Sequence, residues 1–279
     1  MPPTAIPSSV PVAQRILVMG GGDVGSAVAH LLFRCGVRVV VAERERSPHA
    51  RRGMAFTDAL FDGVTVLEGV TSRHVADVQS IEDCWRQADC VPLVTLPENL
   101  LSAAIRFDVV IDATMRREPT RADIRAMAPC VIGLGPGYEP GLNCHVAIET
   151  QWGDQMGAVL RDRRAADRSG GPRALDGVTR ERFIPAPEAG VWHTSASLGQ
   201  RVRRGDVVGT LGEHALLAPI DGHLRGLARD GVHVPAGQRL AEVDPRQLPE
   251  VEGLGERPRA VALGVIEALG LPAPPATTA

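Results

Sequence analysis

The chain of 279 residues contains no lysine: all 30 of its basic side chains are arginines. An arginine side chain cannot act as a general base at neutral pH. Without an amine side chain, Schiff-base catalysis and a phosphate-binding loop of the Walker A type are also excluded. Aromatic residues make up only 3% of the chain, which argues against a surface on which nucleic-acid bases stack.

Long apolar runs and a strong excess of charge are absent as well. No run approaches the ~18 apolar residues of a membrane-spanning helix, so we expect no membrane partner. The formal net charge of −3 argues against nucleic acid as a partner. The five cysteines are an odd set without the spacing of a disulfide scaffold, and the first residues lack the basic start and apolar core of a signal peptide. These features predict a cytoplasmic protein.

An internal repeat is the clearest pattern that is present. Residues 186–243 contain the same pattern twice, offset by 32 positions, which indicates a duplicated structural unit. Short β-branched runs between glycines predict strands and tight turns in each copy. We expect the copies to interleave, because neither can bury its apolar face alone. The matching residues are Ala186, Pro187, Gly190, Ala196, Gly199, Val202 and Gly205 in the first copy, and Ala218, Pro219, Gly222, Ala228, Gly231, Val234 and Gly237 in the second.

The first half opens with a glycine-rich turn between a predicted strand (15–19) and a predicted helix. In the pattern Gly-x-Gly-x-x-Gly, Gly20 would permit the tight turn, Gly22 the approach of a pyrophosphate and Gly25 the close packing of helix on strand. The N-terminus of the predicted helix, after Gly25, would favour an anion, and Asp23 in the turn is a candidate cofactor-binding residue at the same edge of the sheet. The next predicted strand ends at Glu43, where a ribose-binding carboxylate is expected.

Two further features follow that turn. Arg51 and Arg52 come soon after Glu43 and are candidate ligands of an additional phosphate group. Strands and helices then alternate, with strands predicted at 64–70, 91–96, 107–114 and 130–137. This alternation predicts a parallel sheet with helices on both faces. Ligands of such sheets lie beyond the carboxyl ends of the strands, which is where Asp112 would stand.

A second glycine-rich loop occupies residues 133–141. Its exposed amides, at Gly133, Gly135 and Gly137, are candidates for binding an anion. Cys144 and His145 follow, and the cysteine can be interpreted as a thiolate, a sulfur acceptor, a metal ligand or a small buried apolar residue. No C-x-x-C pair accompanies them, so no metal site is predicted. Cys84 and Cys90 are interpreted as packing residues on different faces of one helix.

Two resemblances extend this reading. The segments SLGQRVRRGDVVGTLG and LAPIDGHLRGLARDGVHVPAGQRLAEVD resemble the halves of a biotinyl/lipoyl-type barrel-sandwich hybrid, but the chain has no lysine to carry the cofactor arm. The order GGGDVG, DVVIDA, VIGLGPGYEPGLNCHVAIET, TRERFIPAPEAGVW and the duplicated module resembles the YqeB-type accessory proteins of selenium-dependent molybdenum hydroxylase systems. They are related more loosely to xanthine dehydrogenase accessory factors. The chain departs from that pattern at Trp152 and Asp154, where the family more often has Arg and His.

The predicted fold class is α/β, a Rossmann-like parallel sheet followed by a small all-β barrel-sandwich hybrid. The predicted boundaries are a disordered tail (1–12), a Rossmann-like ligand-binding domain (13–157), a linker (158–183), the barrel-sandwich domain (184–246), a C-terminal helix (247–270) and a second tail (271–279).

The resemblance implies maturation or cofactor supply for a client molybdenum hydroxylase, similar to xanthine dehydrogenase. The cofactor handled would be of the molybdopterin type or a dinucleotide such as NAD(P). In this hypothesis the two glycine loops hold the phosphate, Arg51 and Arg52 add charge, and Glu43 holds a ribose. Cys144 faces the soft metal end of the cofactor. Cys144, His145 and Asp112 are the candidate catalytic residues.

Two other functions stay open. An NAD(P)-dependent oxidoreductase would explain Gly20, Gly22, Gly25 and Glu43. Against it, the chain offers no Tyr–Lys proton relay, since Tyr138 is its only tyrosine. A non-catalytic, nucleotide-sensing adaptor would use the repeat module to dock a client. The sequence leaves the assembly state open, a homo-oligomer included.

Overall fold

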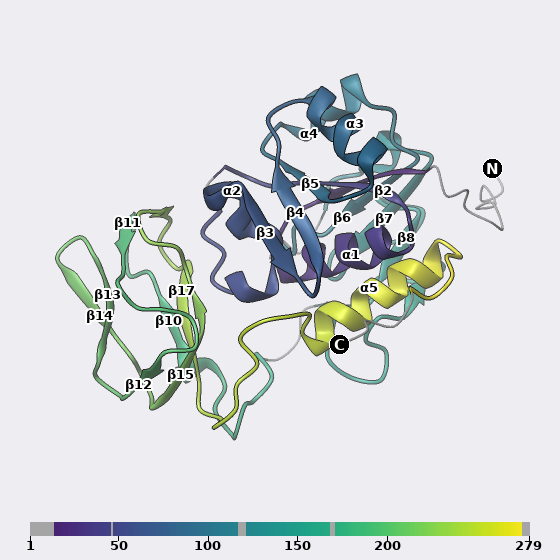
Figure 1. Ribbon diagram of the computed structural model, residues 1–279. Coiled ribbons are helices and arrows are strands. Elements are labelled where there is room, and N and C mark those ends of the chain that lie inside the picture. Colours follow the sequence, from purple (N-terminus) through teal and green to yellow (C-terminus); the bar gives the residue numbers. More distant parts are fainter. Residues whose placement is uncertain (1–13, 46, 117–120, 168–170, 275–279) are drawn as a thin grey trace.

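The computed structural model describes residues 14–45, 47–116, 121–167 and 171–274. Figure 1 shows two parts, a large sheet with helices on both faces and a smaller part built from strands β10 to β17. The predicted tail at 1–12 lies outside the described residues, and so do positions 275–279 of the second predicted tail.

The large sheet has nine strands. Seven of them run parallel, and an antiparallel strand is added at each edge, β3 against β4 and β9 against β8. In order across the sheet, the strands are β3 (Val64–Leu67), β4 (Val70–His74), β5 (Val91–Val94), β2 (Arg38–Ala42), β1 (Arg15–Met19), β6 (Val109–Asp112), β7 (Cys130–Leu134), β8 (Val146–Ile148) and β9 (Val159–Leu160).

Both faces of this sheet are buried, so the inner positions of its central strands are apolar and charged residues stand only at strand ends. In β1, Ile16 and Val18 pack into the core on one face, and Leu17 and Met19 pack into the core on the other. Figure 1 shows α1 and α5 along one face and α3 and α4 along the other. The α-helices are α1 (Asp23–Arg34), α2 (Ala59–Asp62), α3 (Val78–Gln87), α4 (Glu98–Ala104) and α5 (Glu256–Ala268), and the short 3-10 turns are η1 (Arg52–Met54), η2 (Phe56–Asp58), η3 (Arg125–Met127) and η4 (Arg180–Arg182).

The smaller part consists of two four-stranded antiparallel sheets. Each sheet takes two strands from each copy of the repeat, because the strands of the second copy follow those of the first at the same offset. One sheet has the order β10 (Phe183–Pro185), β17 (Arg239–Asp244), β15 (Gly222–Leu227) and β12 (Arg201–Val202). The other has the order β14 (His214–Leu217), β13 (Val207–Leu211), β11 (Gly190–His193) and β16 (His233–Val234). Trp192 and Leu240 lie fully buried in their common core.

The predicted fold class is wrong in both halves. The first sheet is mixed rather than a Rossmann-like parallel sheet, because hairpin partners extend it at both edges. The second part is two separate antiparallel sheets and does not form a clear barrel-sandwich hybrid. Hairpin edges of this kind follow from local turns, such as the two-residue turn at Glu68 and Gly69, where φ is +42° and +79°.

The end of the chain returns to the large sheet. Helix α5 packs against α1 and against β8 and β9. The segment 158–183, predicted as a linker, contains β9 and therefore takes part in the large sheet. Within the part of the chain that the structure describes, no helix combines the length and apolar character needed to cross a membrane.

Candidate functional site

A cleft of about 1090 Å³ lies between the two parts of the molecule. One wall comes from residues that follow the carboxyl ends of parallel strands, such as Met115 after β6, Pro136 after β7 and Thr150 after β8. The opposite wall comes from β10 and β17, and the cleft continues along residues 171–176 and the start of α5. The order of strands reverses at β1, which has β2 on one side and β6 on the other. Ligands of open α/β sheets bind at such points.

The first glycine turn has the close contacts that its sequence predicts. Gly20 has a φ of +97°, which favours glycine. A side chain at Gly25 would place its Cβ 1.8 Å from the carbonyl oxygen of Gly20, so only glycine allows α1 to approach β1 here.

The Glu43 carboxylate accepts hydrogen bonds from the backbone of this turn and of the next residue. The backbone N–H of Gly21 donates a 2.7 Å hydrogen bond to one oxygen of the Glu43 carboxylate, and the N–H of Arg44 donates to the other. Glu43 does not line the cleft. The carboxylate predicted to hold a ribose is therefore engaged with the backbone of its own turn.

The start of α1 is faced by side chains of the segment after β2. A Cβ added at Gly22 would lie 3.3 Å from Cε1 of His49, so the imidazole ring packs against the glycine predicted to face a pyrophosphate. Burial lowers the pKa of His49, which favours the neutral ring, and its buried Nε2 has no hydrogen-bond partner. A dinucleotide pyrophosphate therefore does not fit against Gly22 with His49 in this position, and the geometry gives no support to an NAD(P)-dependent oxidoreductase.

Arg51 lines the cleft but joins two carboxylates from different parts of the molecule. Its Nη1 lies 3.1 Å from Asp23 at the start of α1, and its Nε lies 3.0 Å from Glu242 of β17. Arg182 and Arg225 also contact Glu242, at 3.0 and 3.4 Å. Burial works to raise the pKa of Asp23, but the charge and hydrogen bond of Arg51, together with the charges of neighbouring residues, outweigh burial and hold that pKa at about 2. Arg51 therefore acts as a bridge between the two parts.

Arg52, the other predicted phosphate ligand, points elsewhere. Its Nε lies 3.1 Å from Asp58, and the residue does not line the cleft.

The second glycine loop is filled by its own tyrosine. A Cβ at Gly133 would lie 2.1 Å from Cγ of Tyr138, and a Cβ at Gly135 would lie 2.4 Å from Oγ1 of Thr150. The carbonyl oxygen of Gly137 accepts a hydrogen bond from Asn143. The glycines are thus needed for close packing, and Leu134, Pro136 and Thr150 reach the cleft in their place.

Asp112 organises the carboxyl end of β6. One of its oxygens accepts hydrogen bonds from the N–H and hydroxyl of Thr114, at 2.9 and 2.5 Å, and the other accepts from the hydroxyl of Tyr138. Burial and the neighbouring Asp112 both raise the pKa of Tyr138. Asp112 does not line the cleft, so its role in this structure is to position Thr114 and Tyr138.

Cys144 and His145 do not reach the cleft either. They precede β8, which runs parallel to β7, and so they lie beside the beginning of β7 rather than its carboxyl end. Cys144 is 0% exposed, and burial raises the pKa of its thiol to about 12. His145 accepts a hydrogen bond from the N–H of Val131. The structure therefore does not bring Cys144 to a position where it could face a ligand of the cleft.

The charges around the cleft nearly balance, since nine arginines and eight acidic residues line it. The total charge of the lining therefore does not identify the cleft as an anion site. An anion would bind where individual arginines lack an acidic partner. Arg116 and Arg121 form no ion pair with a described residue. Arg121 lies 5.3 Å above the ring of Tyr138, its Nη2 donates to the carbonyl of Arg116, and its buried Nε has no hydrogen-bond partner.

No sequence motif indicates either of these arginines. The available signal was position, because Arg116 lies four residues after the strand that ends at Asp112.

An aromatic surface forms another part of the cleft wall. Trp152 is 38% exposed, and the guanidinium of Arg173 lies 4.6 Å from its ring centroid. Arg173 is also paired with Glu256 of α5. Trp152, one of the two positions at which the sequence resemblance predicts a different residue, lines the cleft.

Comparisons with known proteins give one clear relative. No family model matches the chain. The chain is 36% identical over 259 residues to "Uncharacterized protein YqeB" of Escherichia coli strain K12. The aligned region covers 92% of this chain and 47% of that protein. The similarity supports the family identity that the motifs indicate. The chain spans about half the length of this relative, whose description names no activity.

Similarity to solved structures is weak. A succinylglutamate desuccinylase/aspartoacylase from Rhodobacter sphaeroides shares 14% identity, with a TM-score of 0.27 and coverage of 84% of this chain and 86% of that chain. The Escherichia coli tRNA N6-threonylcarbamoyladenosine dehydratase TcdA shares 19% identity, with a TM-score of 0.26 and coverage of 44% and 51%. At such scores neither likeness carries an argument about function.

Proposed function

We propose that this homologue of Escherichia coli YqeB binds a phosphate-bearing heterocyclic cofactor in the cleft and acts as an accessory factor in the maturation of a molybdenum hydroxylase. The ligand class is a molybdopterin-type cofactor or a nucleotide. The geometry of the cleft supports ligand binding. The resemblance of the sequence motifs supports a molybdenum hydroxylase as the client.

The observation that carries the proposal is the pair Arg116 and Arg121. Both line the cleft, and neither has an ion pair with a described residue. A guanidinium group offers a planar set of N–H donors that matches a phosphate. The Nε of Arg121 is buried and has no hydrogen-bond partner, so a ligand in the cleft would bind the Nη groups of this guanidinium.

Trp152 supplies the second recognition element. The exposed indole ring, with the guanidinium of Arg173 over one face, is an aromatic surface of the kind on which a pterin or a purine stacks. The volume of about 1090 Å³ lies slightly above the ~300–1,000 Å³ range of small-molecule sites. A cofactor with a ring system and a phosphate tail is therefore of suitable size.

The other residues of the site position these groups. Asp112 accepts hydrogen bonds from Tyr138 and Thr114, and both residues contact Arg121. The guanidinium of Arg121 lies over the Tyr138 ring, and its Nη1 lies 3.4 Å from Oγ1 of Thr114. Cys144 has no part in this account, because it is buried away from the cleft. The protein would hold and present its cofactor rather than react with it through a thiolate.

The substitution Arg121→Gln tests the site. Loss of a charge-assisted contact should weaken binding of a phosphate-bearing ligand by about tenfold or more. Mass spectrometry with metal analysis of the co-purifying small molecule identifies the ligand, and calorimetry then measures its affinity. Arg86→Gln is the matched control, because Arg86 pairs with Asp83 on the exposed side of α3 and lies outside the cleft.

The client is tested in cells. A strain that lacks the protein should lose activity of a xanthine dehydrogenase-like molybdenum hydroxylase, and the wild-type chain should restore it while Arg121→Gln restores less. Full restoration by Arg121→Gln together with unchanged ligand affinity would contradict the proposed role of the cleft.

A further inference from the structure

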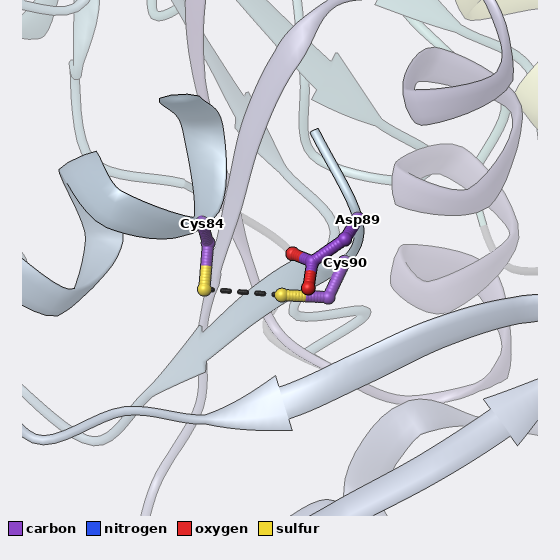
Figure 2. A group of neighbouring side chains, drawn as sticks. All are labelled: Cys84, Asp89 and Cys90. Carbon is purple, nitrogen blue, oxygen red and sulfur yellow. Dashed lines mark hydrogen bonds between the residues drawn. The ribbon is translucent and has the colours of Figure 1, made fainter. Parts of the chain in front are cut away.

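Cys84 and Cys90 form a close pair far from the cleft. Cys84 lies in the last turn of α3, which ends at Gln87, and the chain then turns at Ala88, whose φ of 53° and ψ of 34° are left-handed. Cys90 therefore lies outside the helix, just before β5, and faces back toward it. The two sulfur atoms are 3.0 Å apart, as Figure 2 shows.

Sequence analysis placed these cysteines on different faces of one helix, and that interpretation is wrong because the helix ends between them.

Asp89 supplies a third donor at the same place. One atom from each of Cys84, Asp89 and Cys90 lies within 4.8 Å of the other two. Figure 2 shows the carboxylate beside the sulfur of Cys90. Both cysteines are buried, whereas Asp89 is exposed and pairs with Arg73 of β4 at 3.2 Å. The cluster thus has a buried sulfur side and one oxygen ligand at the surface, through which an ion could enter.

The surroundings favour a metal ion over a redox pair. The two buried sulfur atoms and the surface carboxylate converge on one position, which suits a single ion held by three donors. A disulfide would also make no use of the third donor. A bound cation replaces the thiol protons directly, releases them to solvent and stabilises both thiolates.

We propose that Cys84, Cys90 and Asp89 bind a single Zn²⁺ ion. Two thiolates and one carboxylate are ligands that Zn²⁺ accepts, with a water molecule in the fourth position. Tetrahedral ligation with Zn–S bonds of about 2.3 Å requires sulfurs about 3.8 Å apart, so the pair must open by less than an ångström. None of the three residues lines the cleft, so the site is independent of the proposed cofactor function.

The test is metal titration of the full chain under a phosphine reductant, followed by calorimetry with Zn²⁺ and by absorption with Co²⁺. Wild type should bind one equivalent of Zn²⁺, and Co²⁺ should give thiolate-to-metal charge-transfer bands. Cys90→Ala should abolish both signals. Asp89→Asn changes an exposed side chain and should weaken Zn²⁺ binding by about tenfold or more with the fold intact.

Two matched controls accompany these variants. Cys130→Ala removes a cysteine of β7 outside the cluster, and Asp83→Asn removes an exposed carboxylate of the same helix; both should bind Zn²⁺ like wild type. The absence of stoichiometric binding by reduced wild type would overturn the proposal. So would unchanged affinity in Asp89→Asn, or a Cys84–Cys90 disulfide that forms in air in protein loaded with Zn²⁺.

Discussion

At the scale of single residues, the bridge formed by Arg51 couples the stability of the protein to pH. The pKa of Asp23 is lowered to about 2 by Arg51 against the opposing effect of burial, and the pKa of Glu242 is lowered by the same guanidinium. A carboxyl group with a lowered pKa stabilises the folded state above its unfolded pKa. That contribution is lost as pH falls from about 4 toward 2.

We therefore expect Asp23→Asn to lower the free energy of unfolding near pH 5 by about 2 kcal/mol. The variant should also show a smaller loss of stability between pH 5 and pH 3 than wild type. Urea unfolding at both pH values measures this, with Asp154→Asn, a substitution of an exposed carboxylate, as control. An equal loss in wild type and Asp23→Asn would show that the bridge does not contribute.

The first glycine turn gives a steric prediction. Gly25→Ala should destabilise the protein by about 1–3 kcal/mol or more, because its methyl group would lie 1.8 Å from a carbonyl oxygen. Gly21→Ala, in the same turn, meets its neighbours only at 3.4–3.5 Å and should change the unfolding midpoint much less. Thermal unfolding of the two variants compares them, and similar midpoints would contradict this account of the turn.

Residue-level prediction from sequence was possible where a local rule applies. Gly20 and Gly25 follow from the backbone demands of a strand–turn–helix unit. Glu43 and Cys144 were harder, because their roles depend on which atoms surround them in the folded chain. Glu43 bonds the turn itself, and Cys144 lies beside the beginning of β7 because β8 runs parallel to it.

At the scale of elements, α5 depends on a contact between two glycines. A Cβ at Gly264 would lie 2.0 Å from the carbonyl oxygen of Gly157, so the helix approaches the chain after β8 more closely than any side chain allows. Gly157 has a φ of +85°, and its N–H donates to the carbonyl of Glu149. The contact fixes α5 to the large sheet.

Gly264→Ala should therefore loosen α5, with a destabilisation of about 1–3 kcal/mol and faster proteolysis near the C-terminus. Leu263→Ala is the control on the same helix, because Leu263 is 45% exposed and packs little. Limited proteolysis followed by mass spectrometry locates the cleavage sites. Cleavage patterns that match wild type would contradict the role of the glycine contact.

The sequence predicts several elements well and others poorly, for physical reasons. The repeat shows in the structure as four strands followed by four equivalent strands, since periodic glycines and β-branched residues determine local structure. The strand predicted at 64–70 covers β3, the turn after it and only the first residue of β4, and β9 was not predicted, because short strands carry little periodic signal. The end of α3 depends on a left-handed residue, Ala88, that is not a glycine.

At the scale of the whole molecule, the cleft exists only because the two parts pack together. Arg51 bridges Asp23 and Glu242, and Arg229 of the smaller part pairs with Asp58 of η2 and Asp62 of α2. Side-chain contacts between distant segments determine this arrangement, and no pattern of the sequence indicates them. Only the folded arrangement shows that Arg116, Arg121 and Trp152 line one cleft.

The central claim is that the cleft binds a phosphate-bearing heterocycle, and calorimetric titration of the full chain tests it most directly. The probes are adenosine diphosphate and a pterin phosphate, each with its phosphate-free counterpart. We expect saturable binding of at least one phosphorylated probe, weaker binding of its counterpart, and loss of the difference in Arg121→Gln. Flat titrations with both phosphorylated probes, or equal affinity in wild type and Arg121→Gln, would contradict the claim.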